Sequence, residues 1–472
     1  MSIRSSGSWH GNISGFPVNF AGEECVNPSR KQARYTLVIL FAINLLNFYD
    51  RHIFGALAEP IRREWSLSDS QIGWLATAFT LLYAIVGVPL GRLSDRWNRA
   101  KLLSWGVAAW SLLTAASGLA WNYGSMFAAR LGVGVGEATC APAANSLIGD
   151  LYPSAQRARA LAFFMLGLPL GNFLGTFVSG LIAAAYGWRM AFYVACIPGL
   201  FIAVLALRVP DTPRGASESF PMAGRAHAGS PYWTILKIPT MCLIIVTGAL
   251  FNFIMYALAT FLPAFISRYH SLDLRLSTTI AALAFGLTGV PGLLLGGWAA
   301  DRAAQFRASG RLLVGFGATM AAAIFLGLAF SQLPGRVTAF VALLGTGCMI
   351  AFAYYASVYA TIQEIVPPSL RGTAMALYFL AMYLLGGSFG PVLTGKLSDY
   401  FARRAMATAG ASAMNEHFRA AGLHTAMYAI PVCAAFVSVV LLVAARTVPE
   451  DMDNLRAWMS TPAGNLHEEG RQ

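Results

Sequence analysis

The chain has 472 residues, of which 57% are hydrophobic and only 11% are charged. A soluble domain carries about 25% charged residues, so this composition excludes a soluble enzyme and indicates helices packed in lipid. The formal net charge is +12, but the basic residues lie in short loops between apolar segments, which argues against a nucleic-acid-binding surface.

The chain begins with residues 1–34, which are polar and lack the basic start and apolar core of a signal peptide. We expect them to form a cytoplasmic segment that stays in the protein. Twelve apolar stretches follow, each near the roughly 20 residues that a helix needs to cross a bilayer. The predicted spans are 35–58, 72–90, 102–120, 125–147, 160–185, 191–207, 240–266, 278–300, 312–331, 337–362, 373–397 and 425–445.

A polar, proline-rich linker at 208–239 divides these spans into two six-helix halves, 35–207 and 240–445, and residues 446–472 form a predicted cytoplasmic tail. The two halves repeat a motif. Asp150 and Arg157 follow span four, and Glu364 and Arg371 follow span ten. Asp150 and Glu364 are 214 residues apart, and so are Arg157 and Arg371. Such duplication is typical of secondary transporters with a site between the repeats near the bilayer midplane.

The arginines predict the orientation. The loop after span two contains Arg92, Arg96, Arg99 and Lys101, whereas the loop after span three contains no basic residue. Because basic loops stay on the cytoplasmic side, both termini are predicted to be cytoplasmic. The loop at 398–424 contradicts this bias, since it also carries arginines. The Ala-, Gly- and Arg-rich composition favours a bacterial source, and hence the inner membrane.

Two motifs connect the chain with a known family. The stretch Gly91-Arg-Leu-Ser-Asp95-Arg96-Trp-Asn-Arg99-Ala-Lys101 resembles the loop signature of the major facilitator superfamily, with Asn98 in place of the usual glycine. Arg130-x-x-x-Gly134-x-Gly136 in span four is similar to the second motif of that superfamily. The resemblance covers residues 35–445 and implies an all-α membrane protein with two six-helix halves, and a transporter rather than an enzyme.

A narrower resemblance lies in spans one and four. The segments Asn47-Phe-Tyr-Asp50-Arg51 and Gly134-Val-Gly136-Glu137-Ala138 resemble the spinster branch of the superfamily, whose members move lysophospholipids and sphingosine phosphates. The resemblance therefore implies an amphiphilic anionic lipid as substrate. Close relatives within a branch differ in cargo, so the family name alone does not assign the substrate.

Four charged residues lie inside predicted spans: Asp50 and Arg51 in span one, and Arg130 and Glu137 in span four. Ionisable residues are costly in a membrane and indicate function by default. We expect opposite charges on the two helices to pair. Asp50 is the preferred proton carrier and Glu137 the second choice, while Arg51 and Arg130, with Asn47 on the face of Arg51, are expected to bind an anionic headgroup. The alternative is a static network that only holds the first half together.

The second half has no charged residue at 241–266, 278–300 or 312–331. Its polar residues are softer, and we expect Asn252, Tyr256, Tyr355 and Tyr383 to line the substrate site. Charges on one wall and aromatic residues on the other suit a molecule with a polar head and an apolar tail. The alternative, about equally weighted, is that these tyrosines only pack.

Charged residues at the cytoplasmic ends of the spans form a predicted gate that closes the inner face in one state and breaks in the other. The alternative assigns them to loop solubility and orientation. The predicted gate residues are Asp95, Arg96, Arg99, Asp150, Arg157, Glu364 and Arg371.

These observations predict a secondary active, proton-coupled carrier of anionic lysolipid-like amphiphiles that works by alternating access. The alternative within the superfamily is a carrier of small organic acids, aromatic compounds or drugs. We find no P-loop, metal-spaced His/Cys cluster or Ser-His-Asp series, so we expect neither an enzyme nor a cofactor or metal. The expected partners are the substrate, protons and membrane lipids, with no nucleic acid, and we expect a monomer.

Overall fold

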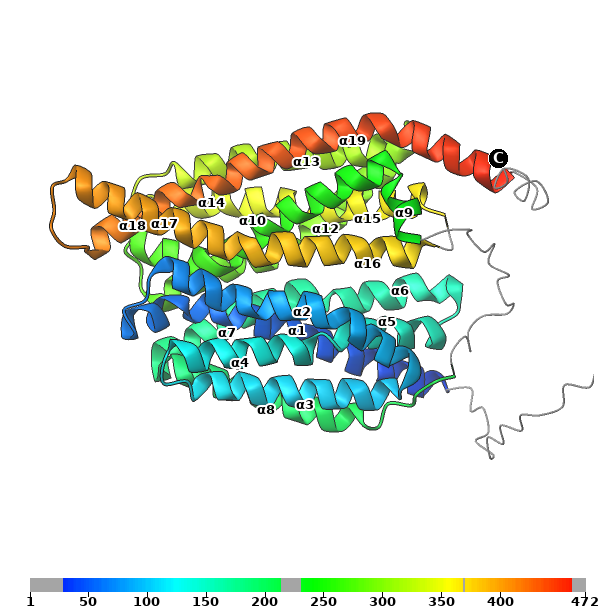
Figure 1. Cartoon of the computed structure of the whole chain (residues 1–472), viewed down its shortest axis with the longest axis horizontal. Coiled ribbons are helices and arrows are strands. Elements are labelled where there is room, and N and C mark those ends of the chain that lie inside the picture. Colours follow the sequence, from blue (N-terminus) through cyan, green and yellow to red (C-terminus); the bar gives the residue numbers. More distant parts are fainter. Residues whose placement is uncertain (1–28, 214–230, 368–369, 461–472) are drawn as a thin grey trace, which may run out of the picture.

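The computed structural model describes residues 29–213, 231–367 and 370–460, and every regular element in this part of the chain is a helix (Figure 1). The first half contains α1 (Arg30–Glu64), α2 (Asp69–Arg96), α3 (Arg99–Gly118), α4 (Tyr123–Glu137), α5 (Cys140–Leu151), α6 (Ser154–Met165), α7 (Gly167–Tyr186) and α8 (Trp188–Ala206).

After the short helix α9 (Pro231–Leu236), the second half contains α10 (Pro239–Tyr269), α11 (Leu274–Ala281), the π-helix η1 (Ala282–Leu287), α12 (Gly289–Ala304), α13 (Gly310–Phe330), α14 (Val337–Ala351), α15 (Ala353–Ile365), α16 (Arg371–Ala381), the π-helix η3 (Met382–Gly387), α17 (Ser388–Thr408), α18 (Glu416–Met427) and α19 (Ala429–Ser460). Ten single or consecutive helices are long and apolar enough to cross a bilayer. Predicted spans three and four correspond to α3 and to α4 with α5, in the same bundle. The all-α membrane fold is confirmed.

Several spans contain a break, which the sequence did not indicate. Helices α4 and α5 are separated at Ala138 and Thr139, and α14 and α15 are separated at Phe352. Ala138 and Phe352 are 214 residues apart, the spacing of the repeated loop motif. The internal repeat therefore extends to the backbone geometry of the fourth and tenth spans. The π-helices interrupt the eighth and eleventh spans in the second half only, within the described residues.

The two halves lie side by side with their helices along the long axis of the molecule (Figure 1). We call the end where α1 begins and α19 ends the terminal end, and the opposite end, with the α1–α2 and α17–α18 connections, the distal end. Two spans are longer than expected at their C-termini. Helix α17 continues to Thr408 and α19 to Ser460, so much of the predicted loop and tail is helical. Asp451 on the α19 extension accepts from the Thr240 amide at 3.0 Å, capping α10 and explaining the added length.

Glycines bring the halves into backbone contact toward the distal end. A Cβ atom at Gly55 of α1 would lie 2.0 Å from the carbonyl oxygen of Ala259 in α10. A Cβ at Gly73 of α2 would lie 2.4 Å from the carbonyl oxygen of Pro391 in α17. Since no side chain fits between these helices, the halves are closed against each other on this side of the bundle.

Candidate functional site

The four charged residues predicted in the spans are buried in the first half. Asp50 and Arg51 in α1 are 3% and 9% exposed, and Arg130 and Glu137 in α4 are 1% and 0% exposed. Arg51 Nε lies 3.1 Å from Glu137 Oε2, and Asn47 Nδ2, one turn before Arg51, donates to the same oxygen at 2.8 Å. The predicted pairing of opposite charges between spans one and four is confirmed for Arg51 and Glu137.

The rest of this buried network is incompletely bonded. Among the described residues, Asp50 Oδ1, Glu137 Oε1, and Arg130 Nε and Nη1 have no hydrogen-bond partner. The Arg130 guanidinium instead lies between the rings of Phe54 and Phe79, at 5.6 and 5.5 Å from their centroids. Buried polar groups are almost always bonded. The cluster therefore retains hydrogen-bonding capacity for further partners.

Aromatic rings surround Arg51. Its guanidinium carbon lies 4.3 Å from the ring centroid of Tyr83 in α2, 4.9 Å from that of Phe48, 5.2 Å from that of Phe79 and 5.5 Å from that of Tyr383. Arg51 Nη1 also lies 3.4 Å from the Tyr383 hydroxyl. Tyr383 belongs to η3, so Arg51 contacts both halves of the protein.

The second half supplies an aromatic surface beside Arg51. Tyr383 contacts Tyr256 and Phe379, with ring centroids 6.3 and 6.4 Å apart, and Phe379 contacts Tyr359 at 5.7 Å. Tyr355 continues the surface from Tyr359 at 5.6 Å. All five rings are half-buried. Of the predicted lining residues, Tyr256, Tyr355 and Tyr383 thus lie on one surface.

Asn252 lies behind this surface. It is buried, and its Nδ2 donates to the Met382 carbonyl of η3 at 2.8 Å. In this structure Asn252 supports the π-helix that carries Tyr383. Its predicted contact with substrate stays a prediction.

The predicted gate residues form contacts within each half at the terminal end. Arg99 pairs with Asp150 and Asp211 in the first half, and Glu364 pairs with Arg311 at 3.1 Å in the second. Arg157 donates to the Gly149 carbonyl at 2.9 Å, Arg96 is exposed, and Arg371 Nε is buried without a partner among the described residues. The side chain of Asp95 lies outside the described part of the chain. Their role as a gate between the halves stays a prediction.

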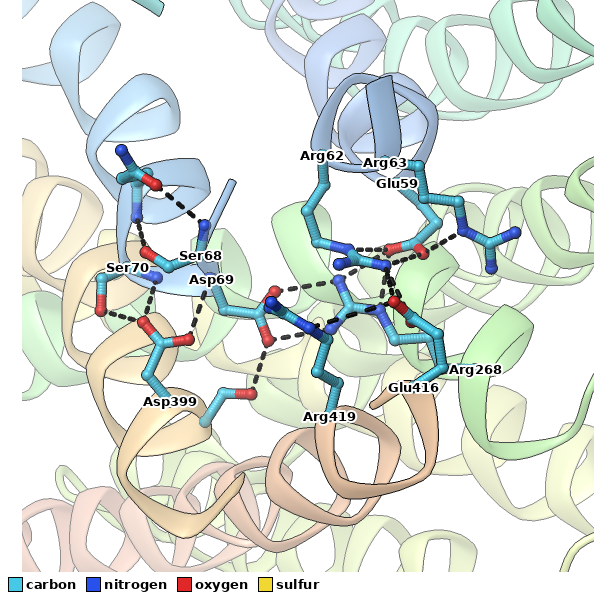
Figure 2. Close-up of polar contacts among 12 residues, drawn as sticks. Glu59, Arg62, Arg63, Ser68, Asp69, Ser70, Arg268, Asp399, Glu416 and Arg419 are labelled. Atoms are coloured by element: carbon cyan, nitrogen blue, oxygen red, sulfur yellow. Dashed lines mark hydrogen bonds and ion pairs between the residues drawn. The ribbon is translucent and has the colours of Figure 1, made fainter. Parts of the chain in front are cut away.

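Ion pairs between the halves lie at the distal end instead (Figure 2). Arg268 of α10 donates from Nε to Glu59 of α1 at 2.7 Å, and from Nη1 and Nη2 to the two oxygens of Asp69 of α2 at 2.9 Å each. The Arg268, Glu59 and Asp69 side chains are at most 5% exposed. Arg62 of α1 binds both Glu416 oxygens of α18, at 3.0 and 2.8 Å.

A carboxylate of the second half also caps a helix of the first. Asp399 of α17 accepts from the backbone amides of Asp69 and Ser70, the first residues of α2, at 3.0 and 2.9 Å (Figure 2). An anion is stabilised at a helix N-terminus by free amides and by the helix dipole. We call Glu59, Arg62, Asp69, Arg268, Asp399 and Glu416 the distal cluster.

A model of the Major Facilitator Superfamily matches residues 40–391. The chain belongs to the major facilitator superfamily. Protein spinster homolog 1 of Mus musculus is 30% identical over 403 residues, covering 79% of this chain and 75% of the mouse protein. An MFS-type efflux pump of Mycolicibacterium smegmatis is 31% identical over 372 residues, covering 76% and 83%.

A solved structure agrees with this assignment. The crystal structure of a bacterial homolog to the human lysosomal transporter Spinster, in an inward-facing and unoccupied conformation, superimposes with a TM-score of 0.78 at 26% identity, covering 90% of this chain and 99% of that one. The predicted membership in the spinster branch is therefore confirmed, and this major facilitator is a multi-pass membrane transporter.

Two groups of residues in this major facilitator were not predicted from the sequence. Tyr83 and Phe79, which contact Arg51, lie among many apolar residues of α2 and give no separate signal. The residues of the distal cluster lie outside the predicted spans, and no role was predicted for them. The Glu59–Arg62 pair, with Arg268 at the end of another span, was an available signal, because basic residues are unexpected on the side opposite the arginine-rich loops.

Proposed function

We propose that this transporter couples the movement of amphiphilic anionic lipids, such as lysophospholipids or sphingosine phosphates, to protons by alternating access. The observation that carries the proposal is the position of Arg51. Its guanidinium lies between Glu137 of the charged first half and the tyrosines of the uncharged second half. A charged group beside an aromatic and aliphatic wall suits a substrate with an anionic head and an apolar tail.

The headgroup binds Arg51 in this proposal, because a guanidinium binds phosphate through two parallel hydrogen bonds. The tail lies along Tyr256, Phe379, Tyr355 and Tyr359, whose rings form a continuous surface from Tyr383. Arg130 and Asn47 complete the polar side of the site.

Proton coupling follows from competition for Arg51. An anion that binds the guanidinium weakens the ion pair with Glu137, and a buried carboxylate without its cation either binds a proton or finds another partner. Arg130 has unpaired Nε and Nη1 atoms within the described residues and is the available partner. Asp50, whose Oδ1 is also unpaired, is the proton carrier in our proposal, and Glu137 is the residue that senses the anion.

We also propose which side of the membrane each end of the molecule faces. The arginine-rich terminal end faces the cytoplasm and the distal end faces outward. The distal cluster then forms the outer seal of an inward-facing state, and the terminal-end charges Arg99, Asp150, Glu364 and Arg371 are available to close the inner face after the seal opens. The protein works as a single chain in the inner membrane of a bacterium.

Transport into vesicles containing the purified protein tests the substrate class. Labelled lysophospholipid is expected to cross faster than a short carboxylate or an aromatic drug, and faster still when a pH gradient is imposed. Equal rates for all three compounds, or transport of the carboxylate or the drug alone, would favour the alternative of a carrier for small organic acids, aromatic compounds or drugs.

A further inference from the structure

The structure leaves Arg51 covered by two tyrosines that come from opposite halves. Tyr83 of α2 and Tyr383 of η3 meet in an edge-to-face contact, with ring centroids 5.2 Å apart and ring planes at 70°. Both rings are half-buried, whereas Arg51 beside them is buried. The pair therefore separates the guanidinium from the more accessible part of the aromatic surface.

The polar end of Tyr383 occupies the position that an anion would take. Arg51 uses Nε for Glu137, and its Nη1 is aimed at the Tyr383 hydroxyl at 3.4 Å, a long and therefore weak hydrogen bond. Arg51 also interacts electrostatically with the phenols of Tyr83 and Tyr256. Nη1 of the guanidinium is thus directed at a neutral phenol, whereas Nε binds the Glu137 carboxylate.

Tyr383 lies on an irregular stretch of the eleventh span. In the π-helix η3 the backbone bonding pattern is shifted, and such segments are frequent at functional sites. Side chains bind its carbonyl groups: Asn252 donates to Met382 at 2.8 Å, and Ser388 donates to Tyr383 at 3.2 Å. If the contact between the rings of Tyr83 and Tyr383 is lost, the carbonyl groups of Met382 and Tyr383 therefore keep these hydrogen-bond partners.

We propose that Tyr83 and Tyr383 form an aromatic closure over Arg51 and that the Tyr383 hydroxyl holds the place of the substrate anion. The rings must part to admit the headgroup, and an anionic oxygen then replaces the hydroxyl at Nη1. Because the two rings belong to different halves, occupancy of Arg51 is transmitted directly to the contact between α2 and the eleventh span. The anion-binding part rests on the proposed function, whereas the closure does not.

Native Cys140 reports on the closure without any substrate. Its thiol is 2% exposed and lies within electrostatic range of Arg51, Glu137 and Tyr83. In a protein with Cys140 as its only cysteine, we expect Tyr83→Ala and Tyr383→Ala each to raise the rate of labelling by methyl methanethiosulfonate about two- to tenfold, the range that corresponds to the loss of one aromatic pair. Tyr359→Ala is the matched control, because it removes a half-buried ring of the same surface without uncovering Arg51, and its labelling rate should equal that of the parent.

Equal labelling rates in the parent and in both closure variants would overturn the closure. Tyr383→Phe keeps the ring, so it should label like the parent, and it guards against a misfolded alanine variant. Tyr383→Phe also tests the hydroxyl. Because a competing partner of Nη1 is lost, lysophospholipid should bind roughly two- to fivefold more tightly. Weaker binding would show that the hydroxyl contacts the substrate and would overturn its assigned role. If the parent binds no lysophospholipid, the proposed function fails, and Cys140 labelling alone decides the closure.

Discussion

At the scale of single residues, the site depends on the partners available to a few buried charges. Arg51 and Glu137 form an ion pair, while Asp50, Arg130 and Glu137 retain unpaired atoms among the described residues. A buried ion pair contributes little net stability, since desolvation offsets most of the attraction. We therefore propose that the cluster exchanges partners during transport, in preference to the alternative of a static network that holds the first half together.

Asp50→Asn tests the proton carrier. The variant keeps the shape and hydrogen-bonding capacity of the side chain but cannot bind and release a proton. We expect it to lose accumulation driven by a pH gradient while keeping exchange of labelled for unlabelled substrate across the vesicle membrane. Accumulation against a concentration gradient by the variant would rule out Asp50 and leave Glu137 as the candidate.

Arg51→Lys tests the headgroup site. Lysine keeps the charge but lacks the planar fork, so we expect the affinity for the anionic lipid to fall about tenfold to a hundredfold, as for loss of a charge-assisted hydrogen bond. The double variant Arg51→Ala with Glu137→Gln serves as a control, because it also neutralises the carboxylate that pairs with Arg51. Unchanged affinity in a binding titration with labelled lysophospholipid would reduce Arg51 to a structural role.

At the scale of helices, the first and second halves repeat their breaks and their terminal ion pairs. The breaks at Ala138 and Phe352 coincide with the repeat, as do the pairs of Arg99 with Asp150 and of Arg311 with Glu364. The close backbone contacts between halves, in contrast, lie toward the distal end. We call this contact region between the halves the seam, and we expect it to separate during transport.

Gly73→Ala tests that seam. The added Cβ would lie 2.4 Å from the Pro391 carbonyl oxygen of the other half, so the helices must separate at a cost of about 1–3 kcal/mol. Spin labels at exposed positions 121 and 400, on opposite halves at the distal end, should show a larger population at long distance. Gly87→Ala in the same helix is the matched control, since its Cβ would contact nothing within 4 Å. Identical distance distributions in both variants would contradict the seam.

At the scale of the whole molecule, the distal cluster joins the halves and the terminal end does not, as far as the described residues show. Helices α1 and α2 meet α10 through buried ion pairs, α17 through a helix cap, and α18 through the ion pair of buried Arg62 with exposed Glu416 (Figure 2). In an alternating-access cycle this cluster must open to water and separate. Its charges are then solvated, which offsets part of the lost attraction.

Arg268→Gln is expected to open the distal end. Glu59 and Asp69 lose their cation from the second half, and breaking a buried pair costs about 3–5 kcal/mol. The same spin labels should report longer distances. Arg63→Gln is the control, because Arg63 also binds Glu59, at 2.7 Å, but is exposed and belongs to the same helix. If the control changes the distances as much as Arg268→Gln does, the loss of charge rather than the link between halves is responsible.

Labelling from the two sides of the membrane tests the orientation. A cysteine at exposed position 308, in the α12–α13 connection of the terminal end, should react with an impermeant maleimide only after cells are opened. A cysteine at exposed position 412, in the α17–α18 connection of the distal end, should react in intact cells. The reverse pattern would invert the assigned sides of the cytoplasmic gate and the outer seal.

The membrane class, the helical fold, the internal repeat and the charges inside spans one and four could all be predicted from the sequence. Each follows from local composition or from spacing along one helix. A helix in lipid must be apolar over its length, and a charged residue within it is energetically costly and therefore indicates a function. Asn47 and Arg51 could be placed on one face for the same reason.

Which charges pair, and where the two halves close against each other, could be seen only in the folded structure. The aromatic rings around Arg51 come from α1, α2 and η3. The residues of the distal cluster come from five helices, and the helices of one half are distant in sequence from those of the other. Nothing in the local sequence distinguishes side chains such as Tyr83, Asp69 and Arg268 from their neighbours in the same helix. Their importance arises from the packing of one half against the other, which depends on contacts between segments hundreds of residues apart and so leaves no periodic signal in either segment.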